Sequence, residues 1–202
     1  MKLHHINRSD LQNNSFTIKH NKYPYFLKIW HCHPELELVV ILKSTGTRFI
    51  GDSIEKFDKG DIVLIGKNLP HMWLNDDVYF SKTSKLKAEA IAIHFNTSFL
   101  GENFFSTPEM TPICELFIMA NFGIHFQNVP KKIIASIKQI TSKDGFEKVI
   151  SFLEILNQLA KYSDFKLLVS NGYVDTSKRN ENENLNNIYE YIFNNFTNGF
   201  TG

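Results

Sequence analysis

Two histidines and a glutamate stand at the start of a strongly apolar stretch, in the run "IWHCHPELELVVILKSTG" that spans residues 29–46. His31 and His33 are two residues apart, so both imidazoles would project from the same face of a β-strand. Glu37 follows after a proline turn that can fold the next strand alongside the first, and His71 comes a hairpin later. Three imidazoles and one carboxylate suit a divalent metal such as Zn, Ni, Mn or Fe, with positions left open for water or a ligand.

The same residues admit a second interpretation. They could form a polar patch that binds the hydroxyl groups of a small effector, or they could hydrogen-bond only within the protein. Aromatic side chains could extend an effector site by stacking on a sugar or an aromatic ring, or they could simply form core, as Trp30 and Phe95 also could. The effector site predicted from the sequence comprises Tyr25, His31, His33, Glu37, Phe49, His71 and Trp73.

Other ionisable residues near these positions are interpreted more simply. We expect Glu35 to be a solvent-exposed turn carboxylate and Cys32, on the opposite strand face from the two histidines, to be an inert buried thiol. His94 alternates with Ile91, Ile93 and Phe95, which indicates a position at the surface or rim. The remaining histidines have no recognisable companions in the sequence; these are His4, His5, His20 and His125.

The first hundred residues have the pattern of short strands separated by turns. Alternating or continuous apolar runs predict strands over 23–33, 36–42, 47–50, 53–57, 62–65 and 87–95. Gly51-Asp52 and the sequence "DKGD" provide the turn signals between them. Several short strands with regular turns favour a small sandwich or barrel.

After residue 100 the periodicity changes to that of helices. Helices are predicted over 108–121, 129–141 and 146–162, and the last of these has apolar residues around more than one face. A short closing strand is expected within 164–173. Residues 175–184 contain no apolar side chain and are expected to form a linker, and an amphipathic helix is expected over 185–196.

Composition limits the classes of function. The formal net charge is +1, and the chain has only 3 arginines, so it has no global electrostatic preference for nucleic acid. The first ten residues lack the apolar stretch of a signal peptide, and no apolar run is long enough to cross a bilayer. Two cysteines form neither a disulfide framework nor a paired zinc motif. We therefore expect a cytoplasmic protein without a membrane partner.

The histidine motifs resemble a known pattern. "HCHPELE" followed by Gly46 resembles the first cupin motif, and "GDIVLIGKNLPHMWLN" resembles the second. The glycine lies slightly later, and Pro70 lies nearer His71, than in the general cupin pattern. At these positions the sequence instead resembles the sensor domains of AraC-type transcription regulators, in which "G-D-x-V-L-I-x-x-x-x-P-H" is a familiar run. "YIFNNFTNGFT", at 191–201, resembles the opening of the DNA-binding domain of the same regulators.

This resemblance implies a mainly β fold with additional α-helices. It implies a cupin-type (double-stranded β-helix or jelly-roll) effector-binding barrel over 1–105 and a helical dimerisation segment over 106–172. A linker over 173–184 and the start of a truncated helix-turn-helix domain over 185–202 would follow.

The favoured function is therefore a non-enzymatic sensor that binds a small-molecule effector, such as a sugar, and forms a homodimer. Promoter DNA would be bound only through the missing C-terminal domain. From residue 173 to 202 the charges are Lys178 and Arg179 against Asp175, Glu181, Glu183 and Glu190, a net of 2 − 4 = −2, which disfavours DNA binding by this segment alone. The alternative is a metal-dependent cupin enzyme, an oxygenase or an isomerase, with the ion held by the three histidines and Glu37.

Overall fold

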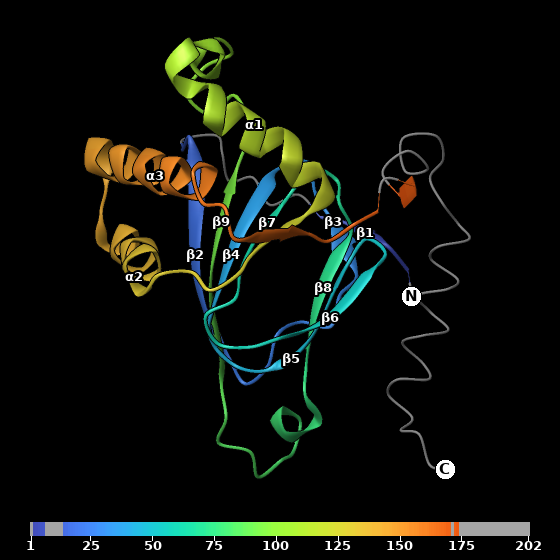
Figure 1. Cartoon of the computed structure of the whole chain (residues 1–202). Coiled ribbons are helices and arrows are strands. Elements are labelled where there is room, and N and C mark those ends of the chain that lie inside the picture. Colours follow the sequence, from blue (N-terminus) through green and yellow to red (C-terminus); the bar gives the residue numbers. More distant parts are fainter. Residues whose placement is uncertain (1, 7–13, 171, 174–202) are drawn as a thin grey trace.

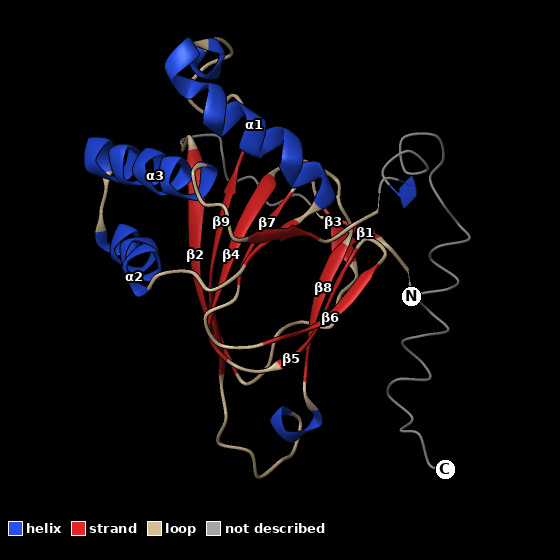
Figure 2. Ribbon diagram, viewed as in Figure 1, coloured by secondary structure: helices blue, strands red, loops and turns tan. Residues whose placement is uncertain are grey.

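The computed structural model describes residues 2–6, 14–170 and 172–173, and it shows two facing β-sheets with helices outside one of them (Figure 1, Figure 2). The first sheet has the order β1 (His4–His5), β3 (His31–Cys32), β8 (His71–Asn75), β5 (Gly46–Ile50) and β6 (Ser53–Phe57). The second has the order β11 (Phe165–Leu167), β10 (Ile124–Phe126), β7 (Ile62–Ile65), β4 (Leu36–Lys43), β9 (Ala88–Phe95) and β2 (Phe16–Tyr23). All pairings are antiparallel except that of β1 with β3. This is the mainly β, cupin-type architecture with added helices that the motifs implied.

Three helices cover the second sheet on the side away from the first (Figure 2). They are α1 (Thr111–Met119), α2 (Lys131–Gln139) and α3 (Gly145–Ala160). Short 3-10 turns are η1 (Asp77–Tyr79), η2 (Phe104–Ser106), η3 (Pro108–Met110), η4 (Ala120–Phe122) and η5 (Ile140–Ser142). No helix among the described residues is both long and apolar enough to cross a membrane.

The second sheet is buried on both faces. On β4 and β9, Leu38, Val40, Ile91 and Ile93 belong to the core that the helices complete through residues such as Phe152. The alternating residues on these strands belong instead to an inner core between the sheets; these are Val39, Ile41 and Ala90, together with Ile50 and Trp73 from the first sheet. Because the side-chain period of a strand is two, each of these strands serves both cores at once.

A smaller cluster lies apart from the inner core. It contains Trp30, Phe49, Met72 and Leu74. Phe49 and Met72 are cross-strand partners on β5 and β8, and their neighbours Ile50 and Trp73 belong to the inner core. Phe49 therefore points away from the space between the sheets, because successive side chains on a strand alternate.

The predicted strand over 23–33 is largely wrong. Residues 24–30 form no strand, and only His31–Cys32 pairs, with β1 and β8. Pro24 lacks a backbone donor, and the segment is the connection by which the chain leaves β2 in the second sheet for β3 in the first. Tyr25 and Leu27 are 42% and 66% exposed, so they do not belong to one buried strand face with His31.

The other predicted elements agree with the structure within a few residues, but four strands were not predicted. These are β1, β2, β8 and β10. β10 pairs with β7 and β11, so residues 106–172 contribute two strands to the second sheet as well as the helices. The predicted linker and the last helix lie outside the described residues.

The two-sided apolar pattern of α3 distinguishes core from surface. Leu156 and Leu159 are 0% and 1% exposed within the chain, whereas Phe146 is 79% exposed and Ile150 is 38% exposed. Leu156 therefore packs on the molecule's own second sheet, and the outer stripe of α3 begins with Phe146 and Ile150.

We predict that Leu156→Ala lowers the free energy of unfolding by about 2–5 kcal/mol, because it leaves a cavity in the core beneath α3. The matched control is Asn157→Ala, at the adjacent exposed position on the same helix, which should change stability by no more than about 0.5 kcal/mol. Urea unfolding followed by circular dichroism at one protein concentration measures both. Similar effects of the two substitutions would contradict this placement of α3.

Candidate functional site

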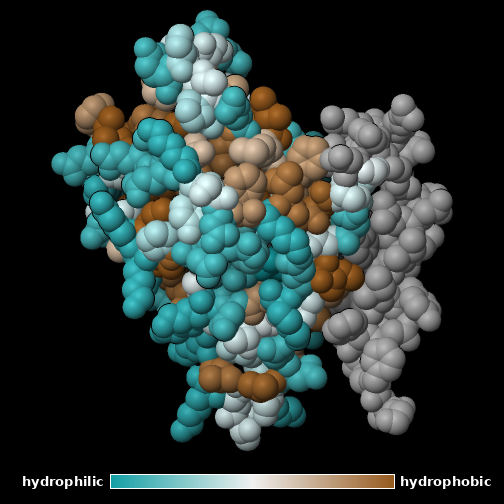
Figure 3. All heavy atoms as spheres, viewed as in Figure 1, coloured by the Kyte–Doolittle hydropathy of each residue, from teal (hydrophilic) through white to brown (hydrophobic). Residues whose placement is uncertain are grey.

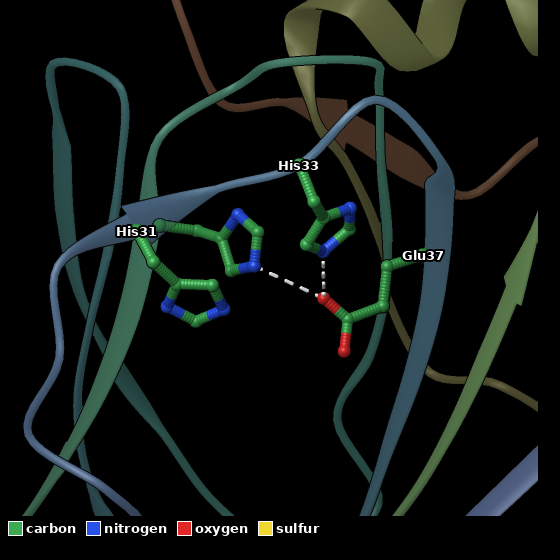
Figure 4. Close-up of side chains that lie close together, drawn as sticks. His31, His33 and Glu37 are labelled. Carbon is green, nitrogen blue, oxygen red and sulfur yellow. Dashed lines mark hydrogen bonds and ion pairs between the residues drawn. The ribbon is translucent and has the colours of Figure 1, made fainter. Parts of the chain in front are cut away.

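The structure brings together the four residues singled out as metal ligands. One potential ligand atom from each of His31, His33, Glu37 and His71 lies within 4.8 Å of those of the others, and all four residues are buried. Glu37 Oε2 is 3.2 Å from His33 Nε2 (Figure 4). The same oxygen is 3.0 Å from His71 Nε2. The His31 ring centroid is 4.3 Å from that of His71. The cluster is thus centred on one carboxylate oxygen.

The site forms where the chain crosses from one sheet to the other. His31 on β3 is paired with His71, the first residue of β8, which places both imidazoles in the first sheet. Three residues after His33 the chain enters β4 of the second sheet, which carries Glu37. The short connection between the sheets therefore holds the carboxylate against the imidazoles, and it is long enough only for a tight turn.

Backbone carbonyl groups fix the orientation of three imidazoles. The Nδ1 atoms of His31, His33 and His71 lie 2.8, 3.1 and 2.7 Å from the carbonyl oxygens of Ile29, Glu35 and Leu69. A carbonyl oxygen can only accept, so each Nδ1 carries the proton and donates it. Each ring then has only Nε2 left to bind a ligand, and this is the outer hydrogen bonding seen around metal-ligating histidines.

This orientation calls for positive charge at the centre of the cluster. A neutral imidazole that donates from Nδ1 would direct the Nε2 lone pair of His33 or His71 at the Glu37 carboxylate, which is repulsive. A cation between these atoms, either protons on the imidazoles or a metal ion, removes the repulsion. Burial by itself would raise the pKa of the Glu37 carboxyl, but the charge of His94 and the close contacts of the carboxylate with His33, His71 and His94 hold that pKa well below its usual range.

His94 is part of this cluster, contrary to the predicted surface or rim position. It is 2% exposed, its Nε2 lies 3.3 Å from Glu37 Oε1, and its ring centroid is 5.1 Å from that of His33. Its strand parity is opposite to that of Ile91 and Ile93, as the sequence showed, but those two residues face the helices. The opposite face of β9 faces the other sheet, so His94 points inward. In the register of the second sheet His94 is the direct partner of Glu37.

Glu35 also differs from its expected exposed position. It is 1% exposed, and its Oε2 lies 3.4 Å from His33 Nδ1, the atom that also contacts the Glu35 carbonyl oxygen. The turn after His33 folds the Glu35 side chain back under the ring rather than into solvent. No signal in a single sequence distinguishes this turn from an exposed one.

A cavity of about 140 Å³ adjoins the cluster between the sheets. His31 and Glu37 form its polar end, and apolar side chains of β4 and β9 form its walls together with Trp73. Its lining residues are Asn21, Tyr23, Phe26, Leu27, His31, Glu37, Val39, Ile41, Trp73, Ala90 and Ala92. The alanines leave the space open, since Ile91 and Ile93 on β9 point to the helices instead.

Of the aromatic residues predicted to contact an effector, Trp73 lines this cavity and Tyr25 and Phe49 do not. The Tyr25 ring packs against Phe80 at a centroid distance of 4.7 Å, on the connection between β2 and β3. Phe49 belongs to the separate cluster with Met72, and Phe95 belongs to the core under the helices. The lining of this cavity therefore includes Phe26, Asn21 and two alanines, and it does not include Tyr25 or Phe49.

Three of the remaining histidines have side-chain partners that the sequence did not reveal. His20 Nε2 is 2.8 Å from Glu89 Oε1, and His125 Nδ1 is 3.0 Å from Arg48 Nη2. His5 Nδ1 lies 3.3 Å from the sulfur of Cys32. Cys32 is buried as expected, and burial raises the pKa of its thiol.

The donor set fits a divalent first-row cation. Three Nε2 atoms and one carboxylate oxygen converge, their outer hydrogen bonds are in place, and the neighbouring cavity provides space for further ligands. The same groups, with protonated imidazoles, could instead bind the oxygen atoms of a small molecule.

Comparisons with known proteins show partial structural likenesses and no sequence relatives. No protein-family model matches the chain, and no curated protein gives a significant match. A cupin 2 conserved barrel domain protein from Salinispora arenicola CNS-205 has 14% identity and a TM-score of 0.35, covering 47% of this chain and 75% of that one.

ToxT from Vibrio cholerae has 13% identity and a TM-score of 0.45, covering 78% of this chain and 61% of that one. Wild-type ToxT from strain SCE256, solved with a bound unsaturated fatty acid, has 11% identity and a TM-score of 0.41, with 73% and 54% covered. The chain thus spans less than two thirds of the length of either ToxT structure.

We predict that, with a chelator present, Nδ1 of His31, His33 and His71 stays protonated at about pH 8.5, above the ordinary pKa of a histidine. Long-range proton–nitrogen correlation spectra identify the protonated ring nitrogen. His20 is the control, because its Nε2 contacts a carboxylate and should carry the proton of that ring. A His71 ring protonated only at Nε2 would contradict the hydrogen bond to Leu69.

Proposed function

We propose that the chain is the ligand-sensing and dimerising module of an AraC-type transcription regulator. The observation that carries the proposal is that β4 and β9 line the cavity with one face and pack against the helices with the other. Glu37, Val39, Ala90 and Ala92 line the cavity from one face of these strands, while the alternating residues on the other face form the core with the helices. A molecule that displaces cavity-wall side chains therefore acts on the same strands that hold the helices.

The cavity suits a compact molecule or the compact end of a larger one. Its volume of about 140 Å³ is close to that of an engineered protein cavity that holds benzene, which corresponds to roughly six to ten non-hydrogen atoms. Apolar contacts would come from Val39 and Ile41, and oxygen atoms would be recognised by His31, Glu37 and Asn21. A small sugar or another compact polar molecule is the proposed class of effector.

The route from the cavity to the helices is a set of close aromatic contacts. Phe95 on β9 and Phe16 on β2 pack against Phe152 of α3 at centroid distances of 4.9 and 4.5 Å. A ligand shifts the helices only to the extent that it binds one arrangement better than another. The module would bias a linked DNA-binding domain in this way.

A divalent cation at the cluster is part of the proposal. His31, His33, His71 and Glu37 would hold Zn, Ni, Mn or Fe, and the cation would bind an oxygen of the effector as a Lewis acid. The chain's own residues would orient the effector and exclude water, since both sheets bury the cluster.

The alternative function is a metal-dependent cupin enzyme, an oxygenase or an isomerase. The observation that favours it is the donor set itself, which equally fits a catalytic metal with open positions. Our proposal is that the chain is not an enzyme. A cation-loaded protein that turns over a small substrate, with turnover lost in His71→Ala, would favour the alternative.

The proposal predicts that filling the cavity removes the response to effector. Ala92→Leu places a larger side chain in the cavity wall, so in the chain joined to its DNA-binding domain a promoter reporter should become insensitive to the inducing condition. Ala92→Ser, which keeps the volume nearly unchanged, is the matched control and should respond like the parent. Chromatin precipitation confirms that both variants still occupy the promoter. A response that persists in Ala92→Leu argues against this cavity as the effector site.

The proposal also predicts a homodimer through the outer faces of α1 and α3. Ile118 is 60% exposed and Phe146 is 79% exposed, and hydrophobic side chains reach the surface around the helical layer (Figure 3). Phe146→Asp should convert a dimer at micromolar concentration into a folded monomer, measured by light scattering. Gln139→Glu adds the same charge at an exposed position on α2, outside the proposed surface, and should leave the dimer intact. A parent protein that is monomeric at micromolar concentration would contradict this prediction.

A further inference from the structure

We propose that His94 is a positioning residue for the cation site, which holds the second oxygen of Glu37 and thereby keeps Glu37 a one-oxygen ligand. This inference rests on the proposed divalent-cation site and adds a residue that the four-residue motif does not contain. His33 and His71 contact Glu37 Oε2, whereas His94 approaches Oε1.

The position of His94 is set by the register of the second sheet. His94 on β9 is the cross-strand partner of Glu37 on β4, and on its other side it is the partner of Thr17 on β2. Direct cross-strand partners have their side chains on the same face, close enough to interact. The sheet therefore places one imidazole behind the carboxylate, independently of the connection that brings His31 and His33 to its front.

The ring nitrogens of His94 are buried without well-aligned hydrogen bonds to the described residues. Its Nε2 lies 3.3 Å from Glu37 Oε1, but neither ring nitrogen makes an aligned hydrogen bond with any residue that the structure describes. The neighbouring Thr17 hydroxyl is buried and also lacks a partner in that part of the chain. Leaving a buried polar group unpaired is costly, so the 3.3 Å contact between His94 Nε2 and Glu37 Oε1 indicates a hydrogen bond that is completed when the carboxylate is held in one orientation.

A cation among the other four residues accounts for this state. When Glu37 Oε2 binds a cation together with three Nε2 atoms, Oε1 is the oxygen left to accept a hydrogen bond, and His94 Nε2–H is the donor beside it. A carboxylate held in this way cannot turn to bind through both oxygens, so a coordination position stays open for the effector. Outer hydrogen bonds of this kind typically contribute about 10- to 100-fold to metal affinity.

The experiment is a titration of the chelator-treated full chain with cobalt(II), by calorimetry and by visible absorption. The parent is compared with His94→Phe, which keeps a ring but removes the donor, and with His94→Gln, which restores an N–H. His20→Phe is the matched control, because His20 forms a histidine–glutamate pair on the neighbouring strand, at the surface and away from the cluster. Circular dichroism and thermal unfolding without cobalt establish that each variant is folded.

The expected result is that His94→Phe weakens cobalt binding by about 10- to 100-fold and changes the intensity of the cobalt absorption bands, which report coordination number. His94→Gln should recover most of the affinity and the parent spectrum, and His20→Phe should match the parent. A merely structural role would alter unfolding without altering the spectrum.

Two outcomes would overturn the inference, and only the second would also contradict the proposed cation site. If the parent binds cobalt and folded His94→Phe binds it equally, with the same spectrum, His94 has no role in positioning and the cation site stands. If the parent itself does not bind cobalt, the cation part of the proposed function falls as well. If His94→Phe does not fold, a folded His94→Ala variant decides: weaker cobalt binding with a changed spectrum supports the inference, and parent-like binding with the parent spectrum contradicts it.

Discussion

The buried carboxylate of Glu37 is the group on which the arrangement of the site depends. Transferring an ionised carboxylate from water into a protein interior is unfavourable unless opposite charge and hydrogen bonds compensate for it. Here the compensation comes from imidazoles on both sides, with His33 and His71 at one oxygen and His94 at the other. The low pKa of Glu37 expresses the same balance, because the neighbouring imidazoles outweigh the effect of burial. Without positive charge in this cluster, the Glu37 carboxylate would therefore not stay ionised in the protein interior.

The positions of those imidazoles are fixed by the backbone around them. His71 donates to the carbonyl of Leu69, and the side chain of Leu69 belongs to the inner core that also contains Val169 and Tyr173. His33 donates to the carbonyl of Glu35, in the turn that joins the two sheets. The packing of the two sheets thus determines the geometry of the site. The orientations of the imidazole rings change only if the turn between the sheets or the inner core changes.

Single-sequence reasoning identified the site where a strand pattern and a motif agreed, and it failed where tertiary context decided. The convergence of His31, His33, Glu37 and His71 follows from motif spacing. The position of His94 required knowing that the second sheet is covered on both faces, because strand parity separates two faces without saying which face meets water. With helices predicted after residue 100, a single covered face was the simpler expectation, and His94 was assigned to the wrong side.

The errors over Tyr25 and Glu35 have a different cause. The alternation of residues 23–33 resembles that of a strand, but this stretch is the crossing between sheets, and Pro24 interrupts the pairing that periodicity alone would allow. Glu35 is polar and lies in a turn, which ordinarily means exposure, yet the turn is enclosed because both of its ends lie inside the barrel. Local sequence describes the conformation of such connections better than it describes what covers them.

The end of the described chain gives the cavity a second connection to the rest of the molecule. After β11, Leu168 and Val169 donate their backbone N–H groups to the carbonyl of Phe122, and Ser170 bonds to Asp52 in the turn between β5 and β6. Val169 occupies the space that a side chain at Gly51 would need. Leu168 and Val169 share the inner core with Val39, Ile41 and Trp73, which also line the cavity.

A close-packed core transmits changes of shape. Displacement of the cavity walls therefore reaches Leu168 and Val169 directly, in addition to reaching the helices through β4 and β9. In the proposed sensor, one cavity would therefore be connected to two regions, the proposed dimer surface and the segment that ends at residue 173.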